Sequence, residues 1–263
     1  MPGISIACLR QALTGHRVNP YGQSLHRTTD GMCVGMEILA RMTTDGQGVL
    51  SPEQFLPAME SRKLRLPVTK SLMLQTSEWL NHVKHHIPDR FVVSFNVCSG
   101  VLNTPEIHTL CRGFISKAPS DVQLCLELTE RQSFRYDQQE MENIARLRRM
   151  GVRVVLDDFG TGYCNFLLLT NNIDGIKIPK VFISSDGDDS RLHIIERNML
   201  ILARELNIDV AAEGVETRAQ YERLKGAGVK VLQGYYFSRP QKLDHYVPLP
   251  SFFREEYPSL SGH

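Results

Sequence analysis

Short apolar runs alternate with helical patterns along almost the whole chain, and this alternation restricts the fold more than any other feature. The apolar runs are rich in Val, Ile and Leu and carry few polar residues, as expected of strands buried on both faces. They are Met32–Leu39, Phe91–Val97, Val122–Leu128, Arg153–Leu156, Ile173–Ile178, Ile208–Ala212 and Val229–Leu232. The segments between them have helical spacing, at Leu66–His85, Thr104–Lys117, Gln138–Met150, Ser190–Leu206 and Thr217–Ala227.

Strands that alternate regularly with helices predict a single α/β domain, a (β/α)8 TIM-like barrel with parallel strands. Leu25 and its neighbours supply a candidate first strand, which we expect to be irregular. An open doubly wound sheet is the rival fold, but the sequence has no glycine-rich phosphate turn of the kind that this fold uses. We expect residues 1–16 to form a linker or short helix, 17–250 the barrel and 251–263 a C-terminal tail.

The charges of the chain nearly cancel, with 30 basic against 29 acidic residues and a net charge of +1. Because this balance is a poor basis for binding a long polyanion, we expect no long nucleic acid as a partner. The six cysteines lack zinc-like spacing, and no apolar run has the length of a membrane span. We therefore expect a reducing, cytoplasmic location, either for the protein or for this domain of a longer membrane protein.

Polar residues follow one strand after another, and all but one, a lysine, carry an oxygen able to bind a hard metal ion. They are Glu37, Asn96, Glu127, Asp157, Asp158, Lys177, Glu213 and Gln233. In a barrel these strand ends converge on one face, and the clustered carboxylates repel one another unless a cation neutralises them. Oxygen ligands favour Mg²⁺ or Mn²⁺ over zinc. The residues alone therefore predict a metal-dependent barrel enzyme, and they fit both two-metal phosphodiester cleavage and enolase-type proton abstraction.

At these residues the sequence resembles the EAL-domain family, the cyclic di-GMP phosphodiesterases, over roughly residues 17–245. Segment 37–41 reads EILAR where the family has EALLR, and segment 157–163 reads DDFGTGY as the family does. Further family motifs follow in order, with FNVC at 95–98, ELTE at 127–130, IKI at 176–178, AEGVET at 212–217 and QGY at 233–235. Each motif is weak alone, but together, in this order and at compatible spacing, they are highly specific.

The resemblance implies hydrolysis of cyclic di-GMP to linear pGpG by in-line attack of a water activated by two Mg²⁺ or Mn²⁺ ions. The metal ligands it implies are Glu37, Asn96, Glu127, Asp157, Asp158 and Glu213. It assigns catalytic roles to Glu37, Lys177 and Glu213, with Lys177 contacting the attacking water. The substrate-binding residues it implies are Gln23, Leu39, Arg41, Glu216 and Gln233. Glu130 resembles the glutamate that anchors the loop at 159–165.

The sequence departs from the family pattern at three places, where Ile38 replaces an alanine, Cys164 and Asn165 replace serines, and Pro179 replaces an aspartate near the guanine. None of these departures removes a proposed metal ligand. The alternative hypothesis is a catalytically degenerate EAL module that binds cyclic di-GMP or a protein partner without hydrolysing it.

Other partners follow from the sequence and from the resemblance. The helix at Leu192–Leu206 is apolar over more than one face, so we expect it to form a homodimer contact. Proteins that resemble this chain often carry a sensory or diguanylate-cyclase domain, which implies a longer parent protein.

Overall fold

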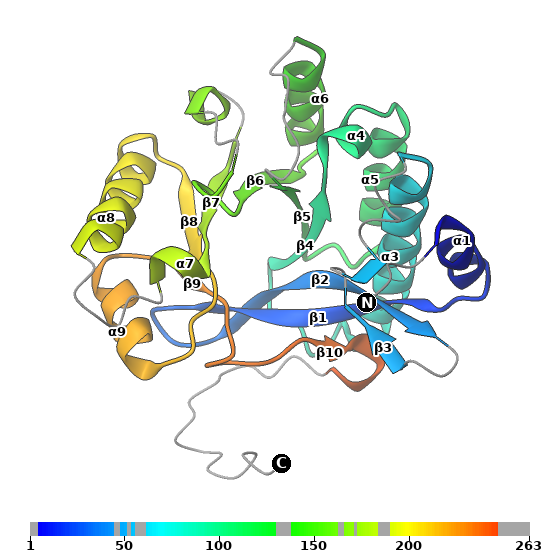
Figure 1. Ribbon diagram of the computed structural model, residues 1–263, viewed down its shortest axis with the longest axis horizontal. Helices are drawn as coiled ribbons and strands as arrows, with labels where there is room; N and C mark the ends of the chain where they lie inside the picture. The colour runs from blue at the N-terminus through cyan, green and yellow to red at the C-terminus, as the bar shows by residue number, and fades with distance from the viewer. Residues whose placement is uncertain are drawn as a thin grey trace.

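The protein is described by a computed structural model at residues 5–44, 48–51, 54–55, 62–129, 138–162, 166–170, 173–183 and 190–246. Eight strands close into a barrel, which confirms the predicted TIM-like fold (Figure 1). They are β1 (Val18–Arg27), β2 (Cys33–Thr44), β4 (Phe91–Val97), β5 (Val122–Thr129), β6 (Arg153–Asp157), β7 (Gly175–Ile178), β8 (Asp209–Ala212) and β9 (Val231–Leu232). Two short strands, β3 (Gly48–Leu50) and β10 (Gln241–Lys242), extend the sheet.

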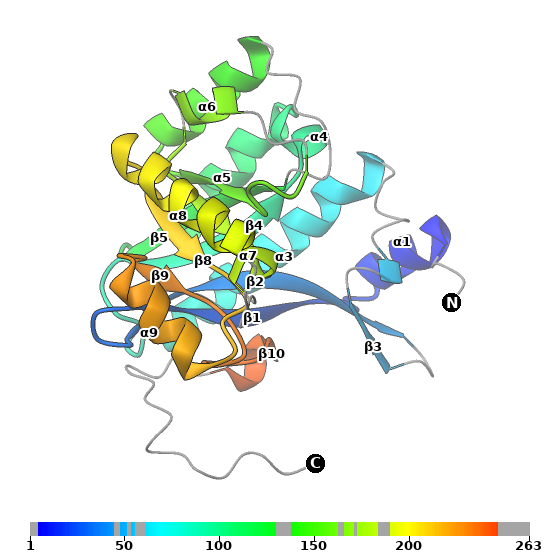
Figure 2. The same ribbon diagram turned by 60° about the vertical axis from the view of Figure 1, so that its left-hand side comes forward.

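The described helices lie outside the barrel, around most of its circumference (Figures 1 and 2). They are α1 (Ile6–Thr14), α3 (Arg62–Val83), α4 (Ser99–Leu102), α5 (Glu106–Lys117), α6 (Gln138–Arg149), α7 (Lys180–Ile183), α8 (Ser190–Glu205) and α9 (Arg218–Gly226), with 3-10 turns η1 (Phe166–Thr170) and η2 (Leu243–His245). Local sequence fixes where these helices begin. At α9, for example, the Thr217 side chain and the Gln220 side chain each bond the other residue's backbone N–H, which forms a capping box.

Strand β1 is antiparallel to both β2 and β9, so the prediction of parallel strands throughout is wrong for the first strand. The reason lies in the connection between β1 and β2, which spans only residues 28–32. A parallel pair needs a crossover of a dozen or more residues, whereas this turn closes with hydrogen bonds from Gly31 N to Arg27 O and from Arg27 N to Met32 O. The remaining barrel strands, from β2 through β9, pair in parallel.

Alternate residues of each strand face the helices and form the main core. On β5, Leu124, Leu126 and Leu128 are fully buried in this way. Helix α5 meets the sheet with residues at helical spacing, including Phe114, whose ring packs edge-on against Phe95 at 5.4 Å. The outer face of the sheet is therefore an apolar layer, which leaves the inner face free for polar residues.

The inner face continues below the polar residues, because residues two positions apart on a strand point the same way. The next residues down include several small side chains, among them Ser94, Cys125, Val155 and Ala211. Barrel interiors are usually filled by bulky branched side chains, and the small ones here leave a cavity of about 130 Å³. The buried Ser94 hydroxyl in its wall has no hydrogen-bond partner among the described residues.

The outer side of β1 is covered by the end of the described chain. Strand β10 pairs with β1 at Tyr21 and Gly22, and η2 follows it along the same strand (Figure 1). Tyr246, just after η2, is buried against Trp79 of α3, with the two rings edge-on at 6.1 Å. The two ends of the barrel sequence therefore meet at β1.

Candidate active site

The structure brings the polar strand-end residues of the sequence analysis to the inner face at one end of the barrel. Each comes from a different strand or from the residue that follows it. Glu37, Asn96, Glu127, Asp157 and Lys177 lie on β2, β4, β5, β6 and β7, Glu213 and Gln233 follow β8 and β9, and Gln23 lies on β1 opposite Glu37.

Lys177 lies at the centre of this group, and its side chain is only 3% exposed. Its Nζ lies 2.7 Å from Glu127 Oε2, 3.3 Å from Glu37 Oε2 and 3.5 Å from Asp157 Oδ1. It also contacts Glu213 Oε1. One buried ammonium group therefore faces four carboxylates.

This imbalance controls the protonation of the group. Burial disfavours the Lys177 ammonium, but the surrounding carboxylates more than offset this effect and hold its pKa well above the usual value. Burial raises the pKa of Glu127 to about 8, although Lys177 opposes the rise. Burial likewise raises the pKa of Glu213 well above its usual value. For Glu37, burial is outweighed by Lys177 and by hydrogen bonds from Gln233 and Asn96, so its pKa is lowered.

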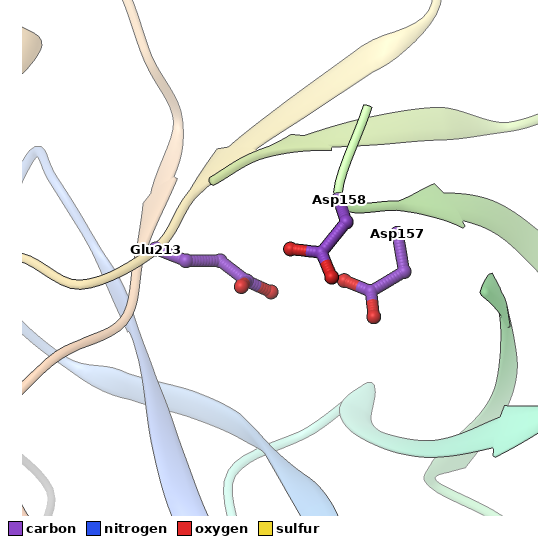
Figure 3. A group of neighbouring side chains, drawn as sticks. All are labelled: Asp157, Asp158 and Glu213. Atoms are coloured by element: carbon purple, nitrogen blue, oxygen red, sulfur yellow. The ribbon is translucent and has the colours of Figure 1, made fainter. Parts of the chain in front are cut away.

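Asp157, Asp158 and Glu213 form a second, more open cluster beside Lys177. One carboxylate oxygen from each residue lies within 4.8 Å of the others. Figure 3 shows the three side chains pointing toward one another from β6, the residue after it, and the end of β8. Three carboxylates at this separation could together hold a cation.

The backbone at Asp158 explains how two adjacent residues can face the same point. Successive residues of a strand normally point to opposite faces. Asp158 has φ +52°, the left-handed conformation that aspartate tolerates better than most residues, and this turns its side chain back beside that of Asp157. The turn is held by hydrogen bonds from Phe159 N to Lys177 O and from Thr161 N to Asp158 O.

The donor atoms of the site suit Mg²⁺ or Mn²⁺. Asp157 Oδ1, Glu213 Oε1 and Gln233 Oε1 are buried oxygens without a hydrogen bond among the described residues. The first two lie within ion-pair distance of Lys177 Nζ, but one ammonium cannot donate to every oxygen around it. Unpaired buried acceptors are costly, and hard divalent cations prefer oxygen ligands. The residues present therefore fit the predicted metal ions.

Two amides hold the Glu37 carboxylate, and one of them, Gln233, also links it to β1. Asn96 Nδ2 donates to Glu37 Oε1 at 2.5 Å, and Gln233 Nε2 donates to Glu37 Oε2 at 2.8 Å. Gln233 Nε2 also reaches Gln23 Oε1 at 3.1 Å. Glu37 is therefore held from three sides, by Asn96, Gln233 and Lys177, which fixes the direction of its carboxylate.

The other predicted substrate-binding residues lie further from Lys177. Leu39 and Arg41 continue β2 beyond Glu37, and both are half-buried. Arg41 donates to the Ala40 carbonyl at 2.9 Å and lies over the Tyr21 ring. Glu216 is exposed and accepts a hydrogen bond from Lys180 Nζ at 2.5 Å. Glu130, the predicted loop anchor, lies outside the described residues, as do Cys164 and Asn165.

Two residues of the site were not predicted from the sequence. Lys180 pairs with Glu216, and its side chain lies against Gly214, where an added Cβ would meet it at 2.4 Å. Ser238 accepts a hydrogen bond from Gln23 Nε2 at 3.1 Å through its backbone carbonyl. Backbone contacts of this kind leave no trace in residue type. The IKIP segment placed Lys180 only three residues after Lys177, which was a usable clue.

Comparison with known families agrees with this geometry. The family model described as the EAL domain matches residues 7–240. The chain belongs to the EAL-domain family. The EAL domain therefore accounts for most of the sequence and for every strand of the closed barrel.

Relatives of this EAL domain include named phosphodiesterases. It is 35% identical over 232 residues to the cyclic di-GMP phosphodiesterase PdeL of Escherichia coli K12, covering 87% of this chain and 64% of PdeL. It is 34% identical over 234 residues to the probable cyclic di-GMP phosphodiesterase PdeG of the same organism, covering 88% of this chain and 46% of PdeG. The chain thus spans less than two thirds of the length of these relatives.

Solved structures show the same fold. The PaMucR phosphodiesterase in complex with c-di-GMP matches with a TM-score of 0.77 and 30% identity, over 90% of this chain and 96% of that one. The EAL enzyme Bd1971, with cAMP and cyclic di-GMP bound, matches with a TM-score of 0.85 and 22% identity, over 92% of this chain and 67% of that one. Within the described ranges, no helix combines the length and apolar character that crossing a membrane requires.

Proposed function

We propose that this EAL domain hydrolyses cyclic di-GMP to linear pGpG with two bound Mg²⁺ or Mn²⁺ ions. The observation that carries the proposal is the buried Lys177 surrounded by carboxylates, next to the cation-binding cluster of Asp157, Asp158 and Glu213. The names of PdeL and PaMucR, whose sequences are at least 30% identical to this one, support the choice of substrate.

The cation ligands in this proposal are Glu37, Asn96, Glu127, Asp157, Asp158 and Glu213. When bound, divalent ions lower the pKa of a coordinated water and stabilise the charge on the attacking and leaving oxygens. The protein fixes the positions of these ligands in advance, since Asn96 and Gln233 orient Glu37, and the left-handed turn at Asp158 orients its carboxylate.

The protonation of Lys177 restricts its role. A lysine can act as a general base only as a neutral amine, but in the metal-free protein the raised pKa keeps the Lys177 side chain charged. We therefore assign Lys177 the role of a hydrogen-bond donor that orients the attacking water and stabilises the negative charge that develops on the phosphoryl oxygens. The predicted substrate contacts of Gln23, Leu39, Arg41, Glu216 and Gln233 belong to the same proposal, with the planar guanidinium of Arg41 suited to a phosphate.

The test is incubation of the purified protein with cyclic di-GMP and Mn²⁺ or Mg²⁺, with pGpG followed by chromatography. We expect turnover in the wild type and at least a hundredfold loss in Glu37→Gln, which keeps the shape of the side chain but removes its charge. Glu222→Gln, on the exposed surface of α9, is the matched control and should retain full activity. Tight binding of cyclic di-GMP without turnover by the wild type would contradict the proposal and favour a receptor.

The predicted homodimer also belongs to this proposal. Ile194, Ile195 and Ile201 of α8 are 40–48% exposed, which leaves apolar surface available for a second copy. Sedimentation of the wild type and of Ile195→Asp at the same concentrations tests this contact. A monomeric wild type across the whole concentration range would contradict it.

A further inference from the structure

A continuous chain of hydrogen bonds runs from Glu37 across β1 to the far side of the strand. Glu37 accepts from Gln233, and Gln233 donates to Gln23 Oε1. Gln23 in turn donates to the Ser238 carbonyl. The Ser238 hydroxyl lies 2.6 Å from Ser24 Oγ, which extends the chain beyond the inner face of the barrel.

The chain continues from Ser24 to His26, on the opposite side of β1 from Gln23. Ser24 Oγ lies 2.8 Å from His26 Nε2, and His26 Nδ1 lies 3.0 Å from the Gly31 carbonyl oxygen. Both Ser24 and His26 are at most 4% exposed. The His26 ring stacks on Phe237 at 4.4 Å, so it also contacts the residue before Ser238.

Two backbone carbonyls, those of Gly31 and Ser238, determine which atom donates at each step. The Gly31 oxygen can only accept, so Nδ1 of His26 carries the proton and Nε2 accepts from the Ser24 hydroxyl. Ser24 Oγ is then the acceptor for the Ser238 hydroxyl. The tautomer of His26 thus follows from the hydrogen bonds around it.

The same reasoning fixes the two amides on the other side. Because the Ser238 carbonyl only accepts, Gln23 presents Nε2 to it and Oε1 to Gln233. Gln233 must then present Nε2 to both Gln23 and Glu37. Its Oε1 is left buried without a hydrogen bond among the described residues, beside the carboxylates that we assign to the cations.

The Ser238 segment is held where this chain requires it. Phe237 N and Ser238 N both donate to the Gly234 carbonyl, which forms a tight turn after β9. A side chain at residue 234 would place its Cβ 2.1 Å from the Val215 carbonyl oxygen, so only glycine permits this close approach. Ser24 N adds a contact to Ser238 Oγ at 3.4 Å.

We propose that Ser24 and His26 are positioning residues, which hold the Ser238 carbonyl in place and thereby fix the amide orientation of Gln23 and Gln233. In this orientation of the Gln233 amide, its oxygen faces the proposed cations or their water ligands. The inference rests on the proposed function for the identity of the reaction, but the hydrogen-bond chain itself does not depend on it. Residues that orient metal-binding groups in this way typically contribute 10- to 100-fold to metal affinity or activity.

The test compares Ser24→Ala with Ser77→Ala. Both changes delete the hydroxyl of a buried serine, but Ser77 bonds the Leu74 carbonyl within α3, away from the site. We expect Ser24→Ala to raise the dissociation constant for Mn²⁺ about tenfold, measured by isothermal titration calorimetry without substrate, and to lower kcat more than it changes KM. Ser77→Ala should lose similar stability and change neither quantity. Ser24→Thr, which keeps a hydroxyl, should restore Mn²⁺ affinity.

Equal Mn²⁺ affinity in Ser24→Ala and the wild type would overturn the positioning role, as would absence of Mn²⁺ binding by the wild type. An equal loss in Ser77→Ala would also overturn it, because the effect would then follow from stability alone. The affinity comparison needs no turnover. If the wild type binds Mn²⁺ but does not cleave cyclic di-GMP, the proposed function is therefore contradicted, whereas the proposed positioning role of Ser24 and His26 is unaffected.

Discussion

Replacing Lys177 by methionine tests the electrostatic basis of the site. Methionine has a similar length and no charge, so the change removes the only cation that faces Glu37, Glu127, Asp157 and Glu213 within the described part of the chain. Removing one partner of a buried ion pair costs about 3–5 kcal/mol, because the remaining charges stay buried without compensation. If the free energy of unfolding falls by about 3 kcal/mol per molar urea, the urea concentration at the unfolding midpoint should fall by roughly 1–2 M.

The assay is urea unfolding, followed by circular dichroism, in buffer with a metal chelator. Lys180→Met is the matched control, since Lys180 pairs with Glu216 at the surface, where both side chains are more than 40% exposed. Such a pair contributes about 0–1 kcal/mol, so the control should unfold close to the wild type. If the urea midpoint of Lys177→Met lies within about 0.5 M of that of Lys180→Met, the electrostatic argument is refuted.

Three further predictions concern pH and packing. Burial raises the pKa of Glu127 from 4.5 to about 8, so the folded, metal-free protein holds a proton that the unfolded chain has lost. The contribution of Glu127 to stability should therefore decline as pH rises from about 5 to 8. The urea midpoint of the wild type should fall over this range, and it should fall less in Glu127→Gln; an equal fall in both would contradict this. Burial lowers the pKa of His26 from 6.5 to about 4, so stability should be lost as pH falls through this window, by up to about 3 kcal/mol. As the pH falls, the urea midpoint of the wild type should fall relative to that of His26→Gln. If the two midpoints change in parallel with pH, His26 does not cause the loss. Val155→Ile places one more methylene in the 130 Å³ cavity and should raise the free energy of unfolding by about 0.5–1 kcal/mol. Thermal unfolding tests this, and a lower melting temperature would mean that the cavity has no space for the added group.

The polar inner layer could be predicted from sequence because strand periodicity and barrel topology together leave little choice. A polar residue at the carboxyl end of an apolar strand must lie at one end of the barrel, and Lys177 and Glu213 do so, whereas Glu37 lies within β2, which continues to Thr44. The apolar run at 91–97 coincides with β4, since every second residue there is buried under helices and the others face the barrel interior.

What could not be predicted depends on backbone geometry. The first strand, with Asn19, Pro20 and Gly22 among its residues, lacks a continuous apolar run, so its antiparallel direction was not visible in composition. The left-handed turn at Asp158 is a property of φ, which an Asp-Asp pair permits but does not require. Ser238 reaches Gln23 through its carbonyl, an atom that every residue has.

The meeting of the two chain ends at β1 has a consequence for how this domain can be excised and how it folds. A fragment that stops at residue 240, where the family match ends, loses β10, Leu243 and Tyr246, and leaves one edge of β1 open to pairing with other chains. Because β1 joins β9 across about 200 residues, the last seam of the barrel can close only after nearly all of the polypeptide is available. During synthesis, β1 must therefore wait for β9 to leave the ribosome before the barrel can close.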